Sequence, residues 1–376
     1  MKDFLTRTEC SAMRGIAILG IMLHNYCHFL KDIVRENEYT WTSAKCDRLW
    51  TIIQQPDEFF PIHLFSFFGH YGVPVFLFLS GFGLVMKYES HDATGISGLS
   101  GFWRFFRYNW LKLFRFLVVG FVLFTMIDAM TYGMHRYQWH EVVGVLGMFA
   151  NVFENPSQVI WPGPYWYFGL TLQVYILYRL VFWNWRHWGV VVAAIVVCWL
   201  LQVICLDDAE TLERLRYNFI GGMLPFGIGI LLARVTEGRF FCYIGVTEGR
   251  FFCYIARCNK RTVPLLRLAG GIVMLSVVLV TAMSMNQQTW LWVPVFIVIG
   301  TIALVKYLPH FILRPLEWVG SISAAIFVSH PIVRKLFVRP YAQEDLYAGL
   351  ILYTVAALVV GWLLLQVINK IPKPKL

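Results

Sequence analysis

The stretch RGIAILGIMLHNYCHFL, from Arg14 to Leu30, determines how the rest of the chain is interpreted. It is apolar over nearly the length needed to cross a bilayer, yet it carries an arginine and two histidines. An ionisable group in hydrocarbon costs several kcal/mol on most scales, so such groups tend to persist only where they have a function. The stretch therefore raises two questions: which class of protein contains it, and what its polar residues do.

The whole chain has the composition of a membrane protein. Of its 376 residues, 58% are hydrophobic and only 14% are charged, whereas a soluble domain carries about 25% charged residues. Apolar runs of about 20 residues, the length of a transmembrane helix, recur throughout the sequence. We predict an all-α polytopic membrane protein with about ten transmembrane helices, forming a single domain over residues 1–376. The predicted spans are 12–30, 66–86, 113–133, 162–182, 188–206, 217–234, 266–284, 289–307, 317–337 and 345–368.

The distribution of charge predicts the orientation of these spans. With both termini in the cytoplasm, 22 of the 32 Lys and Arg residues fall on the cytoplasmic side, as the positive-inside rule requires. The net charge of +10 is then mostly a topology signal, and we expect a lipid bilayer rather than nucleic acid as its partner. Eight scattered cysteines show no zinc-like spacing, so we predict neither a disulfide framework nor a metal site.

One cytoplasmic loop contains a perfect repeat. The sequence VTEGRFFCYI occurs at 235–244 and again at 246–255, separated by Gly245. A solenoid needs at least three units, so two copies are too few for one. We interpret residues 235–255 as a tandem duplication that is neutral for function.

The histidines of the first span are candidates for catalysis. Arg14 lies near the cytoplasmic surface, where its guanidinium can reach water or lipid phosphate without any catalytic role. His24 lies about 15 Å deeper along a helix and cannot do so. His28 follows four residues later, on the same face. A neighbouring helix could satisfy a neutral histidine, but imidazole is also the group best suited to proton transfer near neutral pH.

Other spans carry further polar residues. His70 and Ser80 accompany Pro74 in the second span, and Trp166 and Gln173 lie in the fourth. Small residues and a proline permit a local break that can line a cavity. The aromatic residues around Trp166 fit an interfacial belt, or could stack on sugar rings. The ninth span holds Ser323 and His330, whose ring could instead bond a carbonyl freed by the following proline.

Five motifs in order resemble the acyltransferase 3 family, the bacterial integral-membrane O-acyltransferases that act on carbohydrates. They are Arg14 with His24, GHYGVPVFLFLSGF, FWRFFRYNWLKLFR, WYFGLTLQVYILY and ISAAIFVSHP, and together they extend over nearly the whole chain. The family separates the arginine and histidine by ten residues, whereas nine separate them here, and Asn25 occupies the strict histidine position. Either the helix is locally distorted or Arg14 and His24 need not share a face. We expect no appended extracytoplasmic hydrolase-like domain, so the acceptor would meet the membrane domain directly.

The resemblance implies a multi-pass acyltransferase of the bacterial cytoplasmic (inner) membrane. It would move an acyl group, most simply acetyl, from cytosolic acyl-CoA to a hydroxyl of an extracytoplasmic or lipid-linked carbohydrate. Acyl-CoA would be a co-substrate, with no permanently bound cofactor. His24 would deprotonate the acceptor hydroxyl or take the acyl group itself, and Arg14 would hold donor phosphate or orient the pocket.

The remaining candidates have binding roles. We predict that Arg104, Arg107 and Lys112 bind the CoA phosphates, because guanidinium groups bind phosphate in a bidentate fork. The predicted acceptor or pocket residues are His28, His70, Ser80, Trp166, Gln173, Ser323 and His330. The alternative function is a transporter or flippase of lipid-linked sugars, since intramembrane His and Pro also fit that class.

Overall fold

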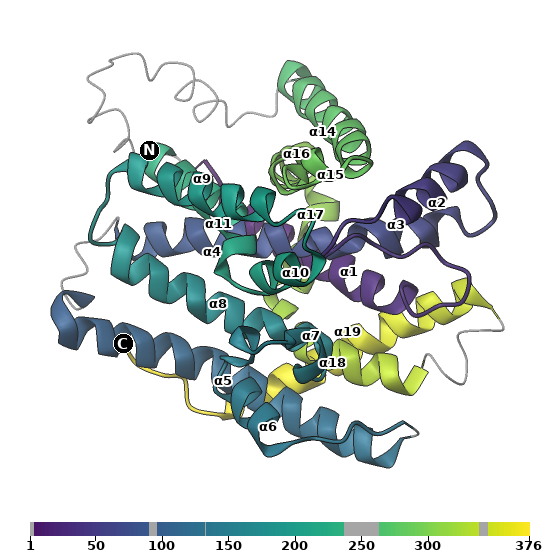
Figure 1. The fold of residues 1–376 in the computed structure, drawn as a ribbon. Helices are drawn as coiled ribbons and strands as arrows, with labels where there is room; N and C mark the ends of the chain where they lie inside the picture. The colour runs from purple at the N-terminus through teal and green to yellow at the C-terminus, as the bar shows by residue number, and fades with distance from the viewer. Residues whose placement is uncertain (1–3, 90–95, 132, 237–262, 338–344) are drawn as a thin grey trace.

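The computed structural model describes residues 4–89, 96–131, 133–236, 263–337 and 345–376, and every regular element in these ranges is a helix (Figure 1). The repeated segment at 235–255 lies outside the described residues except for its first two positions. The α-helices are α1 (Arg7–Cys27), α2 (Ser43–Gln54), α3 (Phe60–Phe68), α4 (Gly72–Tyr88), α5 (Gly98–Met130), α6 (Trp139–Leu146), α7 (Pro156–Val159), α8 (Trp166–Leu177), α9 (Trp188–Ile204), α10 (Ala209–Tyr217), α11 (Phe219–Thr236), α14 (Val263–Ser284), α15 (Gln287–Trp290), α16 (Val293–Tyr307), α17 (His310–Ser321), α18 (Ser323–Phe337) and α19 (Leu346–Lys370). Shorter elements are η1 (Gly69–Tyr71), η3 (Ala150–Val152), η4 (Gly163–Tyr165) and η5 (Tyr178–Phe182).

Several of these helices are long and apolar enough to cross a membrane. Five described spans pass this test, and a sixth is obtained if α17 and α18, which are bent by 72° at their junction, count as one span. The five are Phe60–Tyr88, Gly98–Met130, Phe219–Thr236, Leu266–Ser284 and Leu346–Lys370. Each of the ten spans predicted from the sequence overlaps a helix, but the count of ten stays a prediction. The chain is a multi-pass helical membrane protein.

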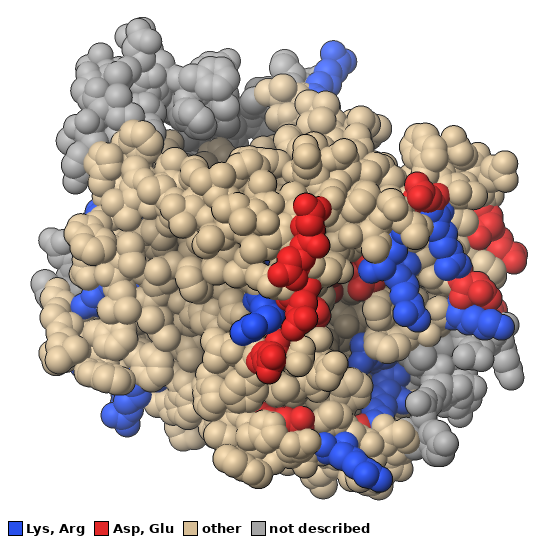
Figure 2. Space-filling view, viewed as in Figure 1, with Lys and Arg blue, Asp and Glu red and all other residues tan. Residues whose placement is uncertain are grey.

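The surface and the ends of the helices agree with this arrangement. Figure 2 shows a broad area without charged side chains over α8 and α9, whereas charged residues gather around α10 and toward α2. In Figure 1, α1 begins and α19 ends on the left-hand side, so the chain enters and leaves the bundle at the same end. That end is the cytoplasmic one in the orientation that the charges predict.

Helix α1 begins at a well-formed cap and packs through glycine. The Thr6 hydroxyl accepts a hydrogen bond from the Glu9 amide, and the Glu9 carboxylate accepts one from the Thr6 amide, which satisfies two otherwise unpaired donors. A Cβ placed on Gly15 or on Gly320 would overlap backbone atoms of the facing helix. Helices α1 and α17 therefore touch backbone to backbone, as small residues allow in membrane bundles.

The segment from α3 to α4 packs closely against α1. The 3₁₀ turn η1 joins the two helices, and a Cβ on Gly69 in this turn would lie 2.7 Å from Cβ of His24. Only glycine permits so close an approach. The break therefore brings the backbone of α3 within reach of the His24 side chain.

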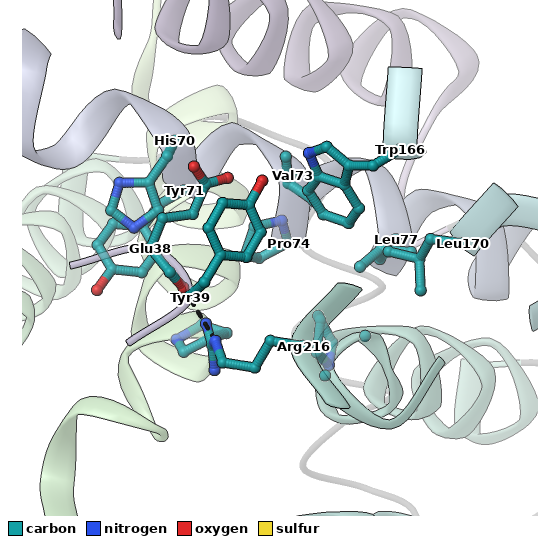
Figure 3. Close-up of a pocket in the computed structure, with 14 residues that line it drawn as sticks. Glu38, Tyr39, His70, Tyr71, Val73, Pro74, Leu77, Trp166, Leu170 and Arg216 are labelled. Atoms are coloured by element: carbon teal, nitrogen blue, oxygen red, sulfur yellow. Dashed lines mark hydrogen bonds between the residues drawn. The ribbon is translucent and has the colours of Figure 1, made fainter. Parts of the chain in front are cut away.

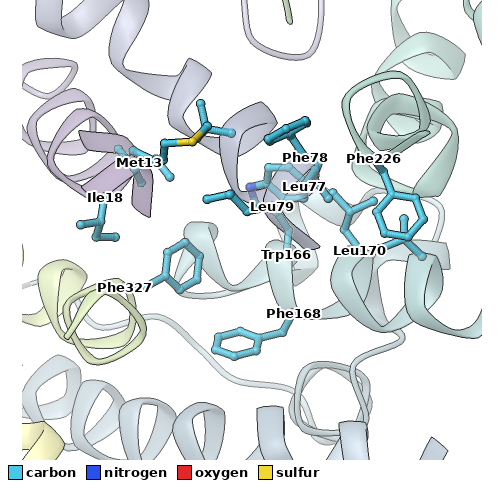
Figure 4. Close-up of a cluster of buried hydrophobic side chains, with 14 of the residues drawn as sticks. Met13, Ile18, Leu77, Phe78, Leu79, Trp166, Phe168, Leu170, Phe226 and Phe327 are labelled. Carbon is cyan, nitrogen blue, oxygen red and sulfur yellow. The ribbon is translucent and has the colours of Figure 1, made fainter. Parts of the chain in front are cut away.

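The apolar core lies where these helices converge (Figure 4). Side chains from α1, α4, α8, α11 and α18 meet there, and their burial in one cluster fixes the relative positions of the helices that carry the site. The labelled members are Met13, Ile18, Leu77, Phe78, Leu79, Trp166, Phe168, Leu170, Phe226 and Phe327.

Candidate active site

His24 is held in one tautomer by the backbone of α3. Its Nδ1 lies 2.7 Å from the carbonyl oxygen of Ser66, and the side chain is buried, with 4% of the residue exposed. A carbonyl oxygen can only accept, so Nδ1 carries the hydrogen and donates it. In the neutral ring Nε2 then has a free lone pair, which is what a general base or nucleophile requires.

Two glutamates from the loop after α1 face this lone pair. The His24 Nε2 atom lies 4.0 Å from Oε1 of Glu36 and 3.9 Å from Oε2 of Glu38. His28 lies on the other side of Glu36, with 2.8 Å between its Nδ1 and Oε2 of that carboxylate. The loop between α1 and α2 therefore folds back over the two histidines and places carboxylates beside both rings.

The two carboxyl groups have opposite protonation tendencies. Burial opposes ionisation of Glu36, but the hydrogen bond with His28 and the charge of protonated His24 outweigh it and hold the pKa of Glu36 below its usual range. Burial, reinforced by the neighbouring Glu36 carboxylate, raises the pKa of Glu38 to about 8. Near neutral pH, Glu36 is therefore the ionised member of the pair.

His24 lines a cavity of about 180 Å³, which we call the histidine cavity. Three histidines, two glutamates, one asparagine and one arginine supply most of its polar groups, and aromatic rings cover much of the rest. Its residues include His24, Asn25, His28, Glu36, Glu38, His70, Trp161, Trp166, Tyr167, Tyr217, Phe327 and Arg334. A mostly apolar lining with a few convergent polar groups is typical of a substrate site.

A smaller cavity of about 50 Å³ adjoins the histidine cavity at Glu38, His70 and Trp166 (Figure 3). On its other side lies Arg216, whose Nε donates a hydrogen bond of 2.9 Å to the Glu38 carbonyl oxygen. The guanidinium also stacks on the Trp290 ring, 4.2 Å from its centroid. Arg216 thus anchors the glutamate loop to α10 and α15.

A larger cavity of about 430 Å³ has a different chemistry, and we call it the basic cavity. Arg14, Lys87 and Lys112 line it together with Ser80 and Ser323. All three basic side chains are exposed, so the cavity opens to the surface. It is large enough for a drug-sized ligand, and its charge suits an anion.

The two cavities meet at an aromatic junction. Tyr167 of α8 and Phe327 of α18 line both of them and are the only described residues that do so. A ligand entering through the basic cavity therefore reaches the histidine cavity where these two rings pack, with their centroids 5.5 Å apart.

Arg14 and His24 line different cavities: Arg14 the basic cavity and His24 the histidine cavity. Helix α1 is a continuous α-helix over Arg7–Cys27, so there is no local distortion and the two side chains do not share a face. Asn25, at the position where the family places histidine, lines the histidine cavity, and its Oδ1 lies 3.3 Å from Nη1 of Arg334. Of the two alternatives that the sequence left open, a locally distorted helix or side chains on different faces, the structure therefore has the second.

The structure gathers most of the predicted site residues into these cavities. His24, His28, His70 and Trp166 line the histidine cavity, while Arg14, Ser80, Lys112 and Ser323 line the basic cavity.

Four predicted residues lie outside the three cavities. Arg104 and Arg107 are exposed on α5 but line none of them. Gln173 donates to Oδ1 of Asn218 at 2.7 Å and accepts from the Phe219 amide at 2.9 Å, so its amide joins α8 to the start of α11. His330 is fully buried, with Nδ1 3.2 Å from the Ile326 carbonyl oxygen of its own helix.

Residues 9–366 match the family model described as an acyltransferase domain, Acyl_transf_3. The chain belongs to the acyltransferase 3 family. No curated protein and no solved structure matches it. The match extends over nearly the whole chain, so both cavities of this acyltransferase lie within the family domain.

Sequence reasoning about the acyltransferase missed four residues that complete the site. Glu36 and Glu38 belong to a loop, where no periodic pattern marks them. Lys87 follows the second predicted span in a basic loop, and Arg334 comes four residues after His330 on α18. Arg334 and Lys335 lie in the last turn of α18, where a basic side chain can reach the membrane surface, so the sequence carries no signal that singles out Arg334.

Proposed function

We propose that this acyltransferase moves an acyl group, most simply acetyl, from cytosolic acyl-CoA to a hydroxyl of a carbohydrate that is extracytoplasmic or lipid-linked. The observation that carries the proposal is the pair of cavities, one basic and one holding the His24 imidazole, that meet at Tyr167 and Phe327. The same proposal places the protein in the bacterial cytoplasmic membrane, with the basic cavity facing the cell interior.

The basic cavity suits the donor. Arg14, Lys87 and Lys112 would bind the CoA phosphates at its mouth, while the pantetheine arm follows its apolar lining toward Tyr167. Arg104 and Arg107, which we had expected to bind phosphate directly, would contribute at most a general positive potential from the outer surface of α5.

The histidine cavity suits the acceptor. The faces of Trp161, Trp166 and Tyr217 can pack against the apolar face of a sugar ring, and Arg334 and the glutamates offer hydrogen bonds to its hydroxyl groups. Aromatic surface combined with a few charged groups matches a carbohydrate better than an apolar acceptor.

The chemistry follows from the His24 tautomer. Nε2 would take the proton of the acceptor hydroxyl while its oxygen attacks the thioester carbonyl carbon, and the ionised Glu36 would stabilise the imidazolium. The carbon–sulfur bond then breaks, and the CoA sulfur receives the proton from His24. The ester and free CoA are the products, and the imidazole returns to its neutral form.

The proposal is tested with His24→Ala in membranes supplied with acyl-labelled acetyl-CoA and the cell's own glycans. We expect incorporation to fall about 10²–10⁴-fold, the usual contribution of a general base. His310→Ala is the matched control, because His310 is exposed at the start of α17 and lines none of the cavities. Full incorporation by His24→Ala would contradict the proposed mechanism.

Two further measurements separate the alternatives. Label that remains on the purified protein after acceptor is withheld would indicate an acyl-histidine intermediate instead of a general base. Mass spectrometry of the surface glycan from cells with and without the protein should show a lost acyl mass. Movement of a lipid-linked sugar without consumption of acyl-CoA would instead indicate a flippase.

A further inference from the structure

We propose that His24, His28 and Glu36 form a binding site for one zinc-class divalent metal ion, and that a metal bound there excludes acyl transfer. The second half of this statement rests on the proposed function, whereas the first half does not. The sequence predicted no metal site, because the carboxylate comes from a loop eight residues beyond His28.

The ligand atoms have the spacing that zinc requires. One donor atom from each of the three residues lies within 4.8 Å of the others. The Nε2 atom of His24 is 4.0 Å from one Glu36 oxygen, and Nδ1 of His28 is 2.8 Å from the other. Zinc–ligand bonds of about 2.0–2.1 Å place the donors of a tetrahedral site about 3.3 Å apart, so small side-chain rotations suffice.

The surroundings of the ligands have the features of a metal site. Metal-bound histidines donate their second ring nitrogen to a carbonyl or carboxylate, and the His24 Nδ1 already donates to the Ser66 carbonyl. Two histidines four residues apart on one helix turn, with a glutamate, are a common zinc ligand set. Three protein ligands leave the fourth tetrahedral position for water or another ligand.

A second observation points to a ligand at the same place. The ring of His70 lies 5.5 Å from that of His24, and only 4% of the residue is exposed. Neither of its ring nitrogens makes a well-formed hydrogen bond to a described residue. Buried polar groups are rarely left without a partner, and a metal-bound water would supply one.

Metal binding and proton transfer compete for the same atom. The Nε2 lone pair of His24 cannot coordinate zinc and accept the acceptor's proton at once. Because a ligating nitrogen must offer a lone pair, binding through Nδ1 of His28 also requires the hydrogen of that ring to lie on Nε2. Zinc should therefore suppress acyl transfer, and a chelator should restore it.

The test uses the purified full-length protein in lipid nanodiscs, titrated with Zn²⁺ and, separately, with Co²⁺. We expect one ion per chain and, with cobalt, the intense visible absorption of a tetrahedral site. His28→Ala and Glu36→Gln should each weaken zinc binding at least tenfold, whereas His310→Ala should leave it unchanged. Co-elution with intact nanodiscs and an unchanged helical circular dichroism signal establish that each variant is folded.

Each outcome decides one part of the proposal. Zinc binding of wild-type strength in both folded variants, or no binding by the wild type, overturns the site. Acyl transfer that persists or rises with one zinc bound overturns the competition. A protein that binds zinc but transfers no acyl group even after a chelator has removed the metal refutes the proposed function and leaves the metal site standing.

Discussion

Replacing Gly69 with alanine should damage catalysis without touching any group that reacts. The added Cβ would lie 2.7 Å from Cβ of His24, and closer still to the Gly20 carbonyl oxygen. Ordinary van der Waals contact begins at 3.4 Å, so η1 and α1 must separate by at least about 0.7 Å. A shift of this size along the bond from His24 to Ser66 lengthens it from 2.7 Å to about 3.4 Å, outside the normal range for a hydrogen bond.

The expected effect is on turnover. A misplacement of about 1 Å can cost about 10²-fold in rate, so we expect kcat of Gly69→Ala to fall about 30- to 100-fold. The KM for acyl-CoA should change less than about twofold, because the basic cavity lies on the other side of the aromatic junction. Initial rates with labelled acyl-CoA at saturating acceptor measure both constants.

Two other glycines calibrate this result. A Cβ on Gly20 would lie 3.1 Å from the Gly69 carbonyl oxygen, so Gly20→Ala requires a shift of a few tenths of an ångström and should reduce kcat less than about tenfold. Gly271 of α14 has no atom within 4 Å of an added Cβ, and Gly271→Ala should behave as wild type. A Gly69→Ala protein that turns over within threefold of wild type would refute the claim that this contact positions His24.

Three further changes test other parts of the molecule. Lys112→Gln should raise the KM for acyl-CoA about three- to tenfold at low salt, because Lys112 lines the basic cavity. Arg104→Gln should leave this KM within twofold. Equal effects of the two substitutions would contradict the assignment of the basic cavity to the donor. Glu89→Gln removes the countercharge that lies 2.9 Å from the buried Arg234 guanidinium. It should lower the free energy of unfolding, measured by denaturant titration, by about 3–5 kcal/mol. An unchanged titration midpoint would show that the ion pair is dispensable. Gln173→Leu should destabilise the fold by about 1–3 kcal/mol, because it removes the two hydrogen bonds that join α8 to α11. The folded fraction should keep its specific activity. Loss of activity without loss of stability would indicate that Gln173 acts in the active site.

The helices could be predicted well from the sequence, because a long apolar run directly indicates a membrane helix. Each predicted span overlaps a helix, and the 3.6-residue period placed His24 and His28 on one face, where the structure has them. The period could not reveal the 72° bend between α17 and α18, because the apolar pattern continues through the junction. It also could not show which side of α5 faces the basic cavity, which Lys112 lines and Arg104 and Arg107 do not.

The candidate site was only half predictable for a related reason. His24 could be recognised as unusual from its depth in an apolar helix. Glu36 and Glu38 could not, because their position depends on the path of a loop that Arg216, from a distant part of the chain, holds in place. Loops have no repeating pattern, so tertiary contacts decide where their side chains point.

The aromatic junction at Tyr167 and Phe327 also bears on how a cell can tolerate such an enzyme. A single water-filled passage from one side of the bilayer to the other would leak protons and dissipate the electrochemical gradient. The two cavities share only these two packed rings among the described residues, so in the proposed function CoA and sugar would each stay in its own cavity while the activated carbonyl group passes between them. Under that proposal, the energy stored in a cytosolic thioester would be delivered to the far side of an insulating membrane without opening a conductive pore.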